Sequence, residues 1–309
     1  CYLPHAKQHK RSWKVDERIA RQHISETFGK RSLTGITRTE VEEWFRSLPR
    51  RKLAPATCNR ILAVFKAIYA LAASYKLLPD GQKPCSGVSA FKVSNKRERY
   101  LSDEEARRLV RELELSPHRE AVVIRLLLLT GARKNEILKA RWEDVHPDRH
   151  LLTVPLSKSG KPRHIALSDE AVKLVRSIPR RAGNPWLFPG HAQGKPLSDV
   201  YGFWNRLRCR LGFPDVRIHD LRHTFASLLV NAGRTLYEVQ MLLGHSDPRT
   251  TMRYAHLGKS TLVAAAQTVS GYLAGLGQSS GRITRSMPVV HKDIRRHGRA
   301  SPIPTGFGR

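Results

Sequence analysis

Residues 219–254, HDLRHTFASLLVNAGRTLYEVQMLLGHSDPRTTMRY, decide how this chain folds and where its polar residues meet. His219 and Arg222 are three positions apart, so a helix would place them on one face. An apolar series with helical period follows, and Gly233 is typical of a left-handed helix end. The stretch therefore predicts a helix that is anchored in a core and carries His219 and Arg222 near its start.

A second helix is predicted in the same stretch. Thr235 and Glu238 have the spacing of a capping box, which favours a helix start. Gly244 fits the end of that helix and places His245 just beyond it. Tyr254 follows nine positions later, on a short segment that begins at Pro248. The stretch thus places His219 and Arg222 near the start of one predicted helix and His245 just after the end of the other.

An arginine upstream also lies between two predicted helices. A buried helix is predicted from about Arg119 to Leu129, and Thr130-Gly131 breaks it. Arg133 then begins the next helix, with Glu136 one turn further on. Glu136 could hold the Arg133 guanidinium by a bidentate pair. The alternative is a surface ion pair that contributes little to stability.

A lysine-containing hairpin is predicted further along the chain. Residues 151–155 and 164–167 alternate like strands, and residues 157–161 join them. Lys158 and Lys161 both lie in this loop. Taken alone, either lysine would be interpreted as an exposed turn residue, so the residues themselves do not choose between the two.

In their order and spacing, these motifs resemble the tyrosine recombinase (phage integrase) family. In that family an Arg, a Lys, a His-x-x-Arg, a His and a Tyr surround one DNA phosphate. The matching segments are Thr130–Ile137, His219–Arg222, Leu243–His245 and Tyr254. The resemblance covers roughly residues 1–275. It favours Lys158 over Lys161 and implies six catalytic residues: Arg133, Lys158, His219, Arg222, His245 and Tyr254.

The resemblance also implies a mechanism. Tyr254 would attack a DNA phosphate, release a 5′-hydroxyl and leave a 3′-phosphotyrosine, without metal, cofactor or ATP. The two arginines would stabilise the charge on the nonbridging oxygens, with Glu136 and Asp220 as supporting carboxylates. Lys158 would be the general acid. His219 would take or steer the tyrosine proton and His245 would donate to the phosphate, although the division between them stays open. His223 and His256 are interpreted as structural residues or as residues that support the catalytic side chains.

The predicted fold is mainly α and has two domains and a tail. Residues 1–94 form a helical core-binding domain, residues 95–275 a mixed α+β catalytic domain with a small antiparallel sheet, and residues 276–309 a basic, disordered tail. The resemblance assigns the catalytic domain to the DNA breaking-rejoining enzyme fold.

Several local elements are predicted as well. Ser12 should cap a helix from Trp13 to Phe28, Ser198 should cap another that ends at Gly212, and Pro79-Asp80-Gly81 should end the helix that begins at Pro55. Residues 186–188 are predicted as a third strand or an apolar loop, and residues 261–273 as a helix.

Composition agrees with a nucleic-acid partner. The net charge is +29, from 55 Lys plus Arg against 26 Asp plus Glu. The four cysteines lack zinc-site spacing, which favours a reduced, cytoplasmic compartment. Residues 121–129 are too short and too interrupted for a membrane span, and no signal peptide is found. Because the chain begins at Cys1 without Met, we expect that upstream residues are missing. Members of the family that it resembles often carry an arm-binding domain upstream, which we expect to be absent or removed here.

The sequence therefore predicts a site-specific recombinase of bacterial or phage origin that acts at the nucleoid. Its expected partners are double-stranded DNA recombination sites and three further copies of itself, with room for accessory DNA-bending proteins. Two alternatives stay open. One is a catalytically idle DNA-binding regulator, and the other is a relaxing enzyme similar to type IB topoisomerases. The target site and the direction of exchange are not encoded in these motifs.

Overall fold

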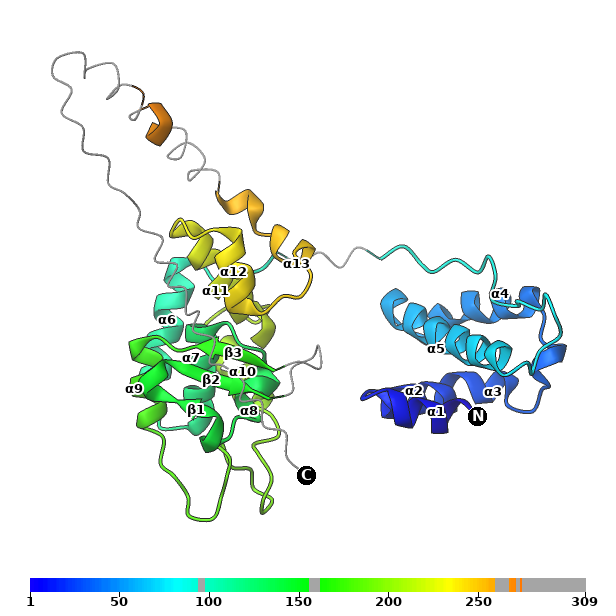
Figure 1. Cartoon of the computed structure of the whole chain (residues 1–309), viewed down its shortest axis with the longest axis horizontal. Coiled ribbons are helices and arrows are strands. Elements are labelled where there is room, and N and C mark those ends of the chain that lie inside the picture. Colours follow the sequence, from blue (N-terminus) through cyan, green and yellow to red (C-terminus); the bar gives the residue numbers. More distant parts are fainter. Residues whose placement is uncertain (94–97, 156–161, 259–266, 271–272, 274–309) are drawn as a thin grey trace, which may run out of the picture. The chain divides into compact units, whose positions relative to one another are not determined.

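A computed structural model describes residues 1–93, 98–155, 162–258, 267–270 and 273 (Figure 1). The chain divides into two compact units, Cys1–Arg97 and Glu98–Arg309. The described residues are mainly helical and contain one small antiparallel sheet, which confirms the predicted fold class. The predicted tail lies outside the described residues, and so does most of the helix predicted at 261–273.

The first unit is helical throughout its described part. Its α-helices are α1 (Tyr2–His9), α2 (Trp13–Ile19), α3 (Ser25–Phe28), α4 (Arg38–Ser47) and α5 (Pro55–Ser74). The single helix predicted from Trp13 to Phe28 is instead interrupted by a π-helical segment, Ala20–Ile24. Ser12 makes no side-chain cap, because its backbone (φ −93°, ψ 17°) is not extended as an N-cap requires. Nothing in the structure explains the π-helical segment.

Helix α5 is the core helix of this unit. It packs Phe65 against Phe28 and Trp44, and Tyr69 packs against Phe65, with ring centroids 5.0 to 5.2 Å apart. By length and composition α5 could cross a membrane, but core helices of soluble proteins satisfy the same criterion. The helix ends at Ser74, before the predicted stop at Pro79, because Lys76 takes a left-handed conformation (φ 56°).

The second unit packs helices around a three-stranded sheet. Its helices are α6 (Asp103–Glu114), α7 (Arg119–Thr130), α8 (Lys134–Leu138), α9 (Asp169–Arg176), α10 (Tyr201–Arg210), α11 (Ile218–Asn231), α12 (Leu236–Leu243) and α13 (Arg249–Met252). The strands are β1 (Val145–His146), β2 (Leu151–Val154) and β3 (Arg163–Ala166), in the order β1-β2-β3. Leu151 pairs with Ala166, and Val154 pairs with Arg163. The hairpin is therefore formed as predicted on both sides of the loop at 156–161, which lies outside the described residues.

The third strand is β1 and not residues 186–188. Those residues form the other predicted alternative, an apolar loop in which Leu187 and Phe188 are buried. The capping boxes at Ser102–Glu105 and Thr235–Glu238 are confirmed. The predicted cap at Ser198 is wrong: Val200 is the N-cap residue of α10, and the Asp199 carboxylate accepts the backbone N–H groups of Val200 and Tyr201.

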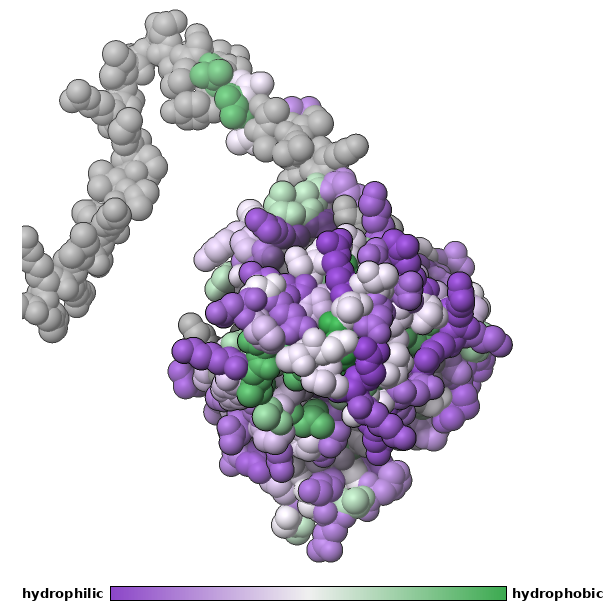
Figure 2. All heavy atoms as spheres, turned by 90° about the vertical axis from the view of Figure 1, so that its right-hand side faces the viewer, coloured by the Kyte–Doolittle hydropathy of each residue, from purple (hydrophilic) through white to green (hydrophobic). Residues whose placement is uncertain are grey.

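Helices α7 and α11 pack against each other. Arg133 follows the end of α7, and His219 and Arg222 lie near the start of α11. Helix α7 is apolar on most of its surface and ends at Gly131, which has a positive φ of 60°. A small second core joins α11 and α12 through Ala226, Val239 and Leu243 and includes the ring of Tyr254. By contrast, the face shown in Figure 2 is mostly hydrophilic, as the basic composition leads one to expect. The apolar contacts therefore fix the end of α7, the start of α11 and the end of α12 next to one another.

Candidate active site

One cavity of about 420 Å³ brings together residues from three separate parts of the sequence. Five of the six residues implied by the family resemblance line it: Arg133, His219, Arg222, His245 and Tyr254. Lys158 and the competing Lys161 lie outside the described residues. The remaining lining residues are His223, Gly244, Ser246, Asp247, Thr250 and Arg253, none of which was predicted to take part.

Arg222 is the most deeply buried charge of this site. Only 4% of the residue is exposed. Its guanidinium donates to the carbonyl oxygens of Gly131 (2.6 Å) and Leu243 (2.7 Å), at the ends of α7 and α12. Burial and the neighbouring Arg133 lower the pKa of Arg222 to about 10, so it stays charged at neutral pH. The fold thus holds a cation of fixed orientation at the base of the cavity.

Arg133 is held by a carboxylate that it shares with a second arginine. Glu136 accepts from Arg133 Nη1 and from the Arg133 backbone N–H, both at 2.9 Å. The same carboxylate lies 3.2 Å from Arg163 Nη2. Side-chain exposure is 30% for Arg133 and 7% for Glu136, so this is a partly buried network and not the surface pair considered above.

Arg163 was not singled out from the sequence, although it shapes the site. It begins β3, only 11% of its side chain is exposed, and its guanidinium donates to the Leu243 carbonyl. Arg163 and Arg222 therefore share that carbonyl oxygen, immediately before Gly244 and His245. Through these contacts the sheet is joined to the end of α12, which carries His245.

Gly244 lets the chain turn over Arg163. Its φ is 64°, and a Cβ there would overlap the Arg163 guanidinium. We expect Gly244→Ala to lower the free energy of unfolding by about 2–4 kcal/mol, from left-handed strain and a displaced arginine. Gly233→Ala is the matched control, because Gly233 has φ 80° but open space around it; it should lose only about 1–2 kcal/mol. Equal losses in urea denaturation would contradict a close approach to Arg163.

His245 is fixed in orientation by a buried threonine. Its Nδ1 lies 2.8 Å from the hydroxyl of Thr251, in α13. Burial, followed by the charge of Arg222, lowers the pKa of His245 to about 3. The ring is therefore neutral at pH 7, and its Nε2 is the nitrogen left to interact with a substrate. The early stop of α12 at Gly244 puts this ring at the cavity.

His219 occupies a more open position, one residue into α11. It also lines a neighbouring cavity, together with Lys134, Tyr201 and Arg217. Burial of its ring, followed by the charge of Arg222, lowers its pKa. The carboxylate of Asp220, beside it in the sequence, points back and accepts the Arg217 backbone N–H at 2.8 Å. Asp220 thus caps the helix that presents His219 and Arg222.

The tyrosine hydroxyl contacts His223, which was interpreted from the sequence as a structural or a supporting residue. Tyr254 is 4% exposed, and its Oη lies 2.5 Å from Nδ1 of His223. Burial raises the pKa of Tyr254 and lowers that of His223 to about 4. A usable signal was present in the sequence: His223 is one helical turn after His219 and directly follows Arg222.

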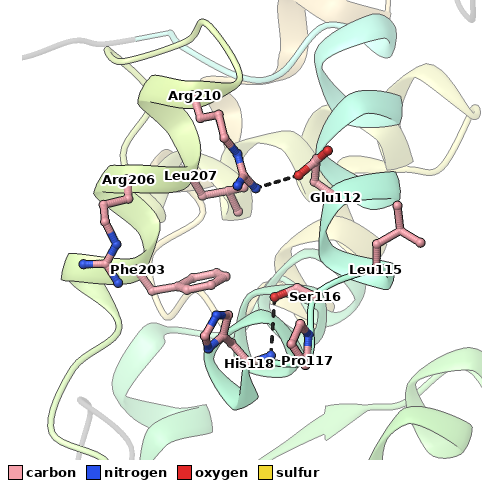
Figure 3. A pocket seen from close by; sticks show the side chains of 9 residues that line it. All are labelled: Glu112, Leu115, Ser116, Pro117, His118, Phe203, Arg206, Leu207 and Arg210. Atoms are coloured by element: carbon pink, nitrogen blue, oxygen red, sulfur yellow. Dashed lines mark hydrogen bonds and ion pairs between the residues drawn. The ribbon is translucent and has the colours of Figure 1, made fainter.

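Another cavity, of about 510 Å³, lies at the end of α6 and beside α10 (Figure 3). Leu115 and Phe203 line it, and Arg210 pairs with Glu112 at its edge at 2.6 Å. It contains none of the residues implied by the family motifs. Within the described residues, no three His, Cys, Asp or Glu side chains form a group that could hold a metal ion.

Comparison with known proteins identifies the family of this chain. Residues 99–261 match the model of the phage integrase family. Tyrosine recombinase XerC of Xanthomonas campestris pv. campestris is 32% identical over 239 residues, which are 74% of this chain and 72% of the relative. The integrase of Escherichia phage 186 is 29% identical over 226 residues, 71% of this chain and 62% of its own.

Solved structures show the same fold. The Tn1549 transposon integrase in complex with a circular intermediate DNA has a TM-score of 0.68 at 20% identity, over 86% of this chain and 96% of that one. A lambda integrase dimer bound to a core site has a TM-score of 0.62 at 19% identity, over 82% and 92%. Fold, motifs and relatives together define a tyrosine-type recombinase. The chain belongs to the phage integrase family.

Proposed function

We propose that this protein is a site-specific DNA recombinase that breaks and rejoins strands through a covalent bond between Tyr254 and a 3′-phosphate. The observation that carries this proposal is the cavity that is lined by three arginines, three histidines and a tyrosine. Such a set fits one phosphate with its attacking group. A covalent intermediate conserves the energy of the broken bond, so a second strand's hydroxyl can reverse the step without ATP.

Each described side chain has a role that its environment supports, and Lys158, which lies outside the described residues, has the role that the family resemblance implies. Arg133 and Arg222 offer forked donors to the nonbridging oxygens, where negative charge grows in the transition state. Arg222 needs no rearrangement, because two carbonyls already fix it. His245, neutral and held by Thr251, donates to a phosphate oxygen. Lys158 protonates the departing 5′-oxygen. Glu136 orients Arg133, and Asp220 caps the helix behind His219.

The proposed partner is double-stranded DNA that carries recombination sites. Solved relatives with the same fold were captured on transposon-end, circular-intermediate and core-site DNA. A net charge of +29 suits a polyanion of that kind. Residues 1–94 would serve as the core-binding domain, residues 95–275 as the catalytic domain and residues 276–309 as a basic tail. A tetramer that acts on two sites in the cytoplasm completes the proposal.

The direct test is capture of the covalent intermediate. Wild-type protein is incubated with a pool of nicked duplexes whose central sequence is randomised, and complexes that resist SDS are isolated and sequenced. We expect an adduct with wild type and none with Tyr254→Phe, which lacks the attacking oxygen. The matched control is Tyr237→Phe on α12, whose tyrosine is 69% exposed and lies outside the cavity; it should form the adduct normally.

The two alternatives give different results in the same experiment. A catalytically idle regulator would select a DNA sequence without forming any adduct. A relaxing enzyme similar to type IB topoisomerases would form the adduct but would also relax supercoiled plasmid that lacks the selected sequence. An adduct in the Tyr254→Phe protein would contradict the assignment of the nucleophile.

A further inference from the structure

His223 is the side chain that contacts the hydroxyl of Tyr254. Its Nδ1 is 2.5 Å from Tyr254 Oη, and the two ring centroids are 5.9 Å apart. The ring of Tyr254 is packed in the small core of α11 and α12, and the His223 ring lies next to it. Among the residues that the structure describes, His223 is the one hydrogen-bond partner that this hydroxyl has.

The direction of this hydrogen bond depends on the protonation states of both groups and on the tautomer of His223. Burial, followed by the charges of Arg253, His219 and Arg222, lowers the pKa of His223 to about 4. Burial raises the pKa of Tyr254, so at neutral pH the phenol keeps its proton. In the tautomer of the neutral imidazole that carries its proton on Nε2, the phenol O–H donates to Nδ1, which accepts. The acceptor is already in line to receive the proton.

We propose that His223 is the general base of strand cleavage, so that the proton of Tyr254 passes to His223 Nδ1 as the phenolic oxygen attacks phosphorus. This inference rests on the proposed function. In the step, the O–H bond of the phenol breaks and an O–P bond forms. The bond from phosphorus to the 5′-oxygen breaks, and that oxygen takes a proton from Lys158. Rejoining reverses both transfers, so that His223 returns its proton to the departing phenol.

Binding of the substrate should raise the low pKa of His223 and so make its imidazole a stronger base. Without DNA, the arginines around His223 disfavour its cationic form. A phosphodiester brings negative charge into the same cavity, and more develops in the transition state. The phenol also becomes more acidic as its oxygen bonds to phosphorus. Proton transfer is therefore favoured at the moment of attack and not before it.

The positions of the two histidines of α11, His219 and His223, indicate different roles. His219 and His223 are one helical turn apart, with ring centroids 5.1 Å apart and planes nearly perpendicular. His219 is the more exposed of the two and also borders the adjacent basic cavity. We therefore assign His219 to the phosphate and its flanking strand, and the tyrosine proton to His223. The sequence motifs left the division of roles between His219 and His245 open; with the tyrosine proton on His223, both of those histidines are left to contact the phosphate.

Two variants test the inference. His223→Asn keeps an acceptor oxygen near the position of Nδ1 but cannot accept the proton, and His223→Phe retains a ring without an acceptor. The probe is the nicked duplex selected by wild type, together with the same duplex carrying sulfur in place of the bridging 5′-oxygen. Sulfur leaves without needing a proton, so it restores variants that lack the general acid and not those that lack the base.

We expect both variants to form the adduct about 10²-fold more slowly than wild type, with no recovery on the sulfur substrate. Lys158→Ala should recover on that substrate. Equal thermal unfolding and duplex binding would show that the variants are folded. Adduct formation by His223→Asn within about threefold of wild type, or its recovery on the sulfur substrate, would overturn the inference alone. Failure of wild type on both substrates would overturn the proposed function with it.

Discussion

We expect Arg222→Lys to slow strand cleavage strongly and to destabilise the protein, and Arg133→Lys to impair cleavage with little loss of stability. Arg222 is 4% exposed and satisfies two carbonyl oxygens at 2.6 and 2.7 Å. A lysine ammonium cannot reproduce that forked geometry, so one carbonyl loses its donor. We expect the free energy of unfolding to fall by about 2–4 kcal/mol and cleavage to fall about 10²–10³-fold or more.

The comparison with Arg133 separates chemistry from folding. Arg133 has 30% side-chain exposure, and its contact with the Gly244 carbonyl is long, at 3.4 Å. Its replacement by lysine should therefore cost at most about 1 kcal/mol of stability while still slowing cleavage about 10²-fold. Urea denaturation and single-turnover adduct formation measure the two effects. Unchanged stability of Arg222→Lys would contradict its role in holding the ends of α7 and α12 together.

Glu136→Gln is expected to be the second most damaging change. This carboxylate, 7% exposed, contacts the backbone and side chain of Arg133 and lies 3.2 Å from Arg163. Its removal leaves Arg133, Arg163 and Arg222 around one cavity without the shared negative charge. Breaking a buried ion pair typically costs about 3–5 kcal/mol. Because glutamine retains part of the hydrogen bonding, we expect a loss of about 2–4 kcal/mol.

Cleavage by Glu136→Gln should fall along with its stability, because Arg133 loses its orientation. The matched control is Glu42→Gln in α4, which breaks the exposed pair with Arg46 and should change stability by less than about 0.5 kcal/mol. High salt should partly restore Glu136→Gln, since anions screen the crowded arginines. If the two substitutions had equal effects, the buried carboxylate would not be the link between the arginines.

Much of the second unit could be predicted because its signals are local. The capping boxes at Ser102 and Thr235 depend on residues three positions apart. The end of α7 at Gly131 and that of α12 at Gly244 follow from glycine's access to positive φ. Arg133, His219, Arg222, His245 and Tyr254 were chosen as a set of motifs, and the fold brings them to one cavity.

The features that were missed depend on contacts between distant segments. Arg163 shapes the site only because β3 lies next to the end of α12, 80 residues later. His223 touches Tyr254 across 31 residues. At the start of α10, the Tyr201 backbone N–H donates to Asp199 and not to Ser198, the residue that was predicted to cap this helix. No periodicity within one helix or strand reports such pairings.

The central claim is that Tyr254 becomes the covalent link to DNA. The most direct measurement is mass spectrometry of the peptides left after protease and nuclease digestion of the SDS-resistant complex. The account predicts that the peptide containing Tyr254 carries the added mass of a 3′-phosphate-linked nucleotide. A nucleotide attached to any other residue, or DNA that is cut without attachment to the protein, would contradict it.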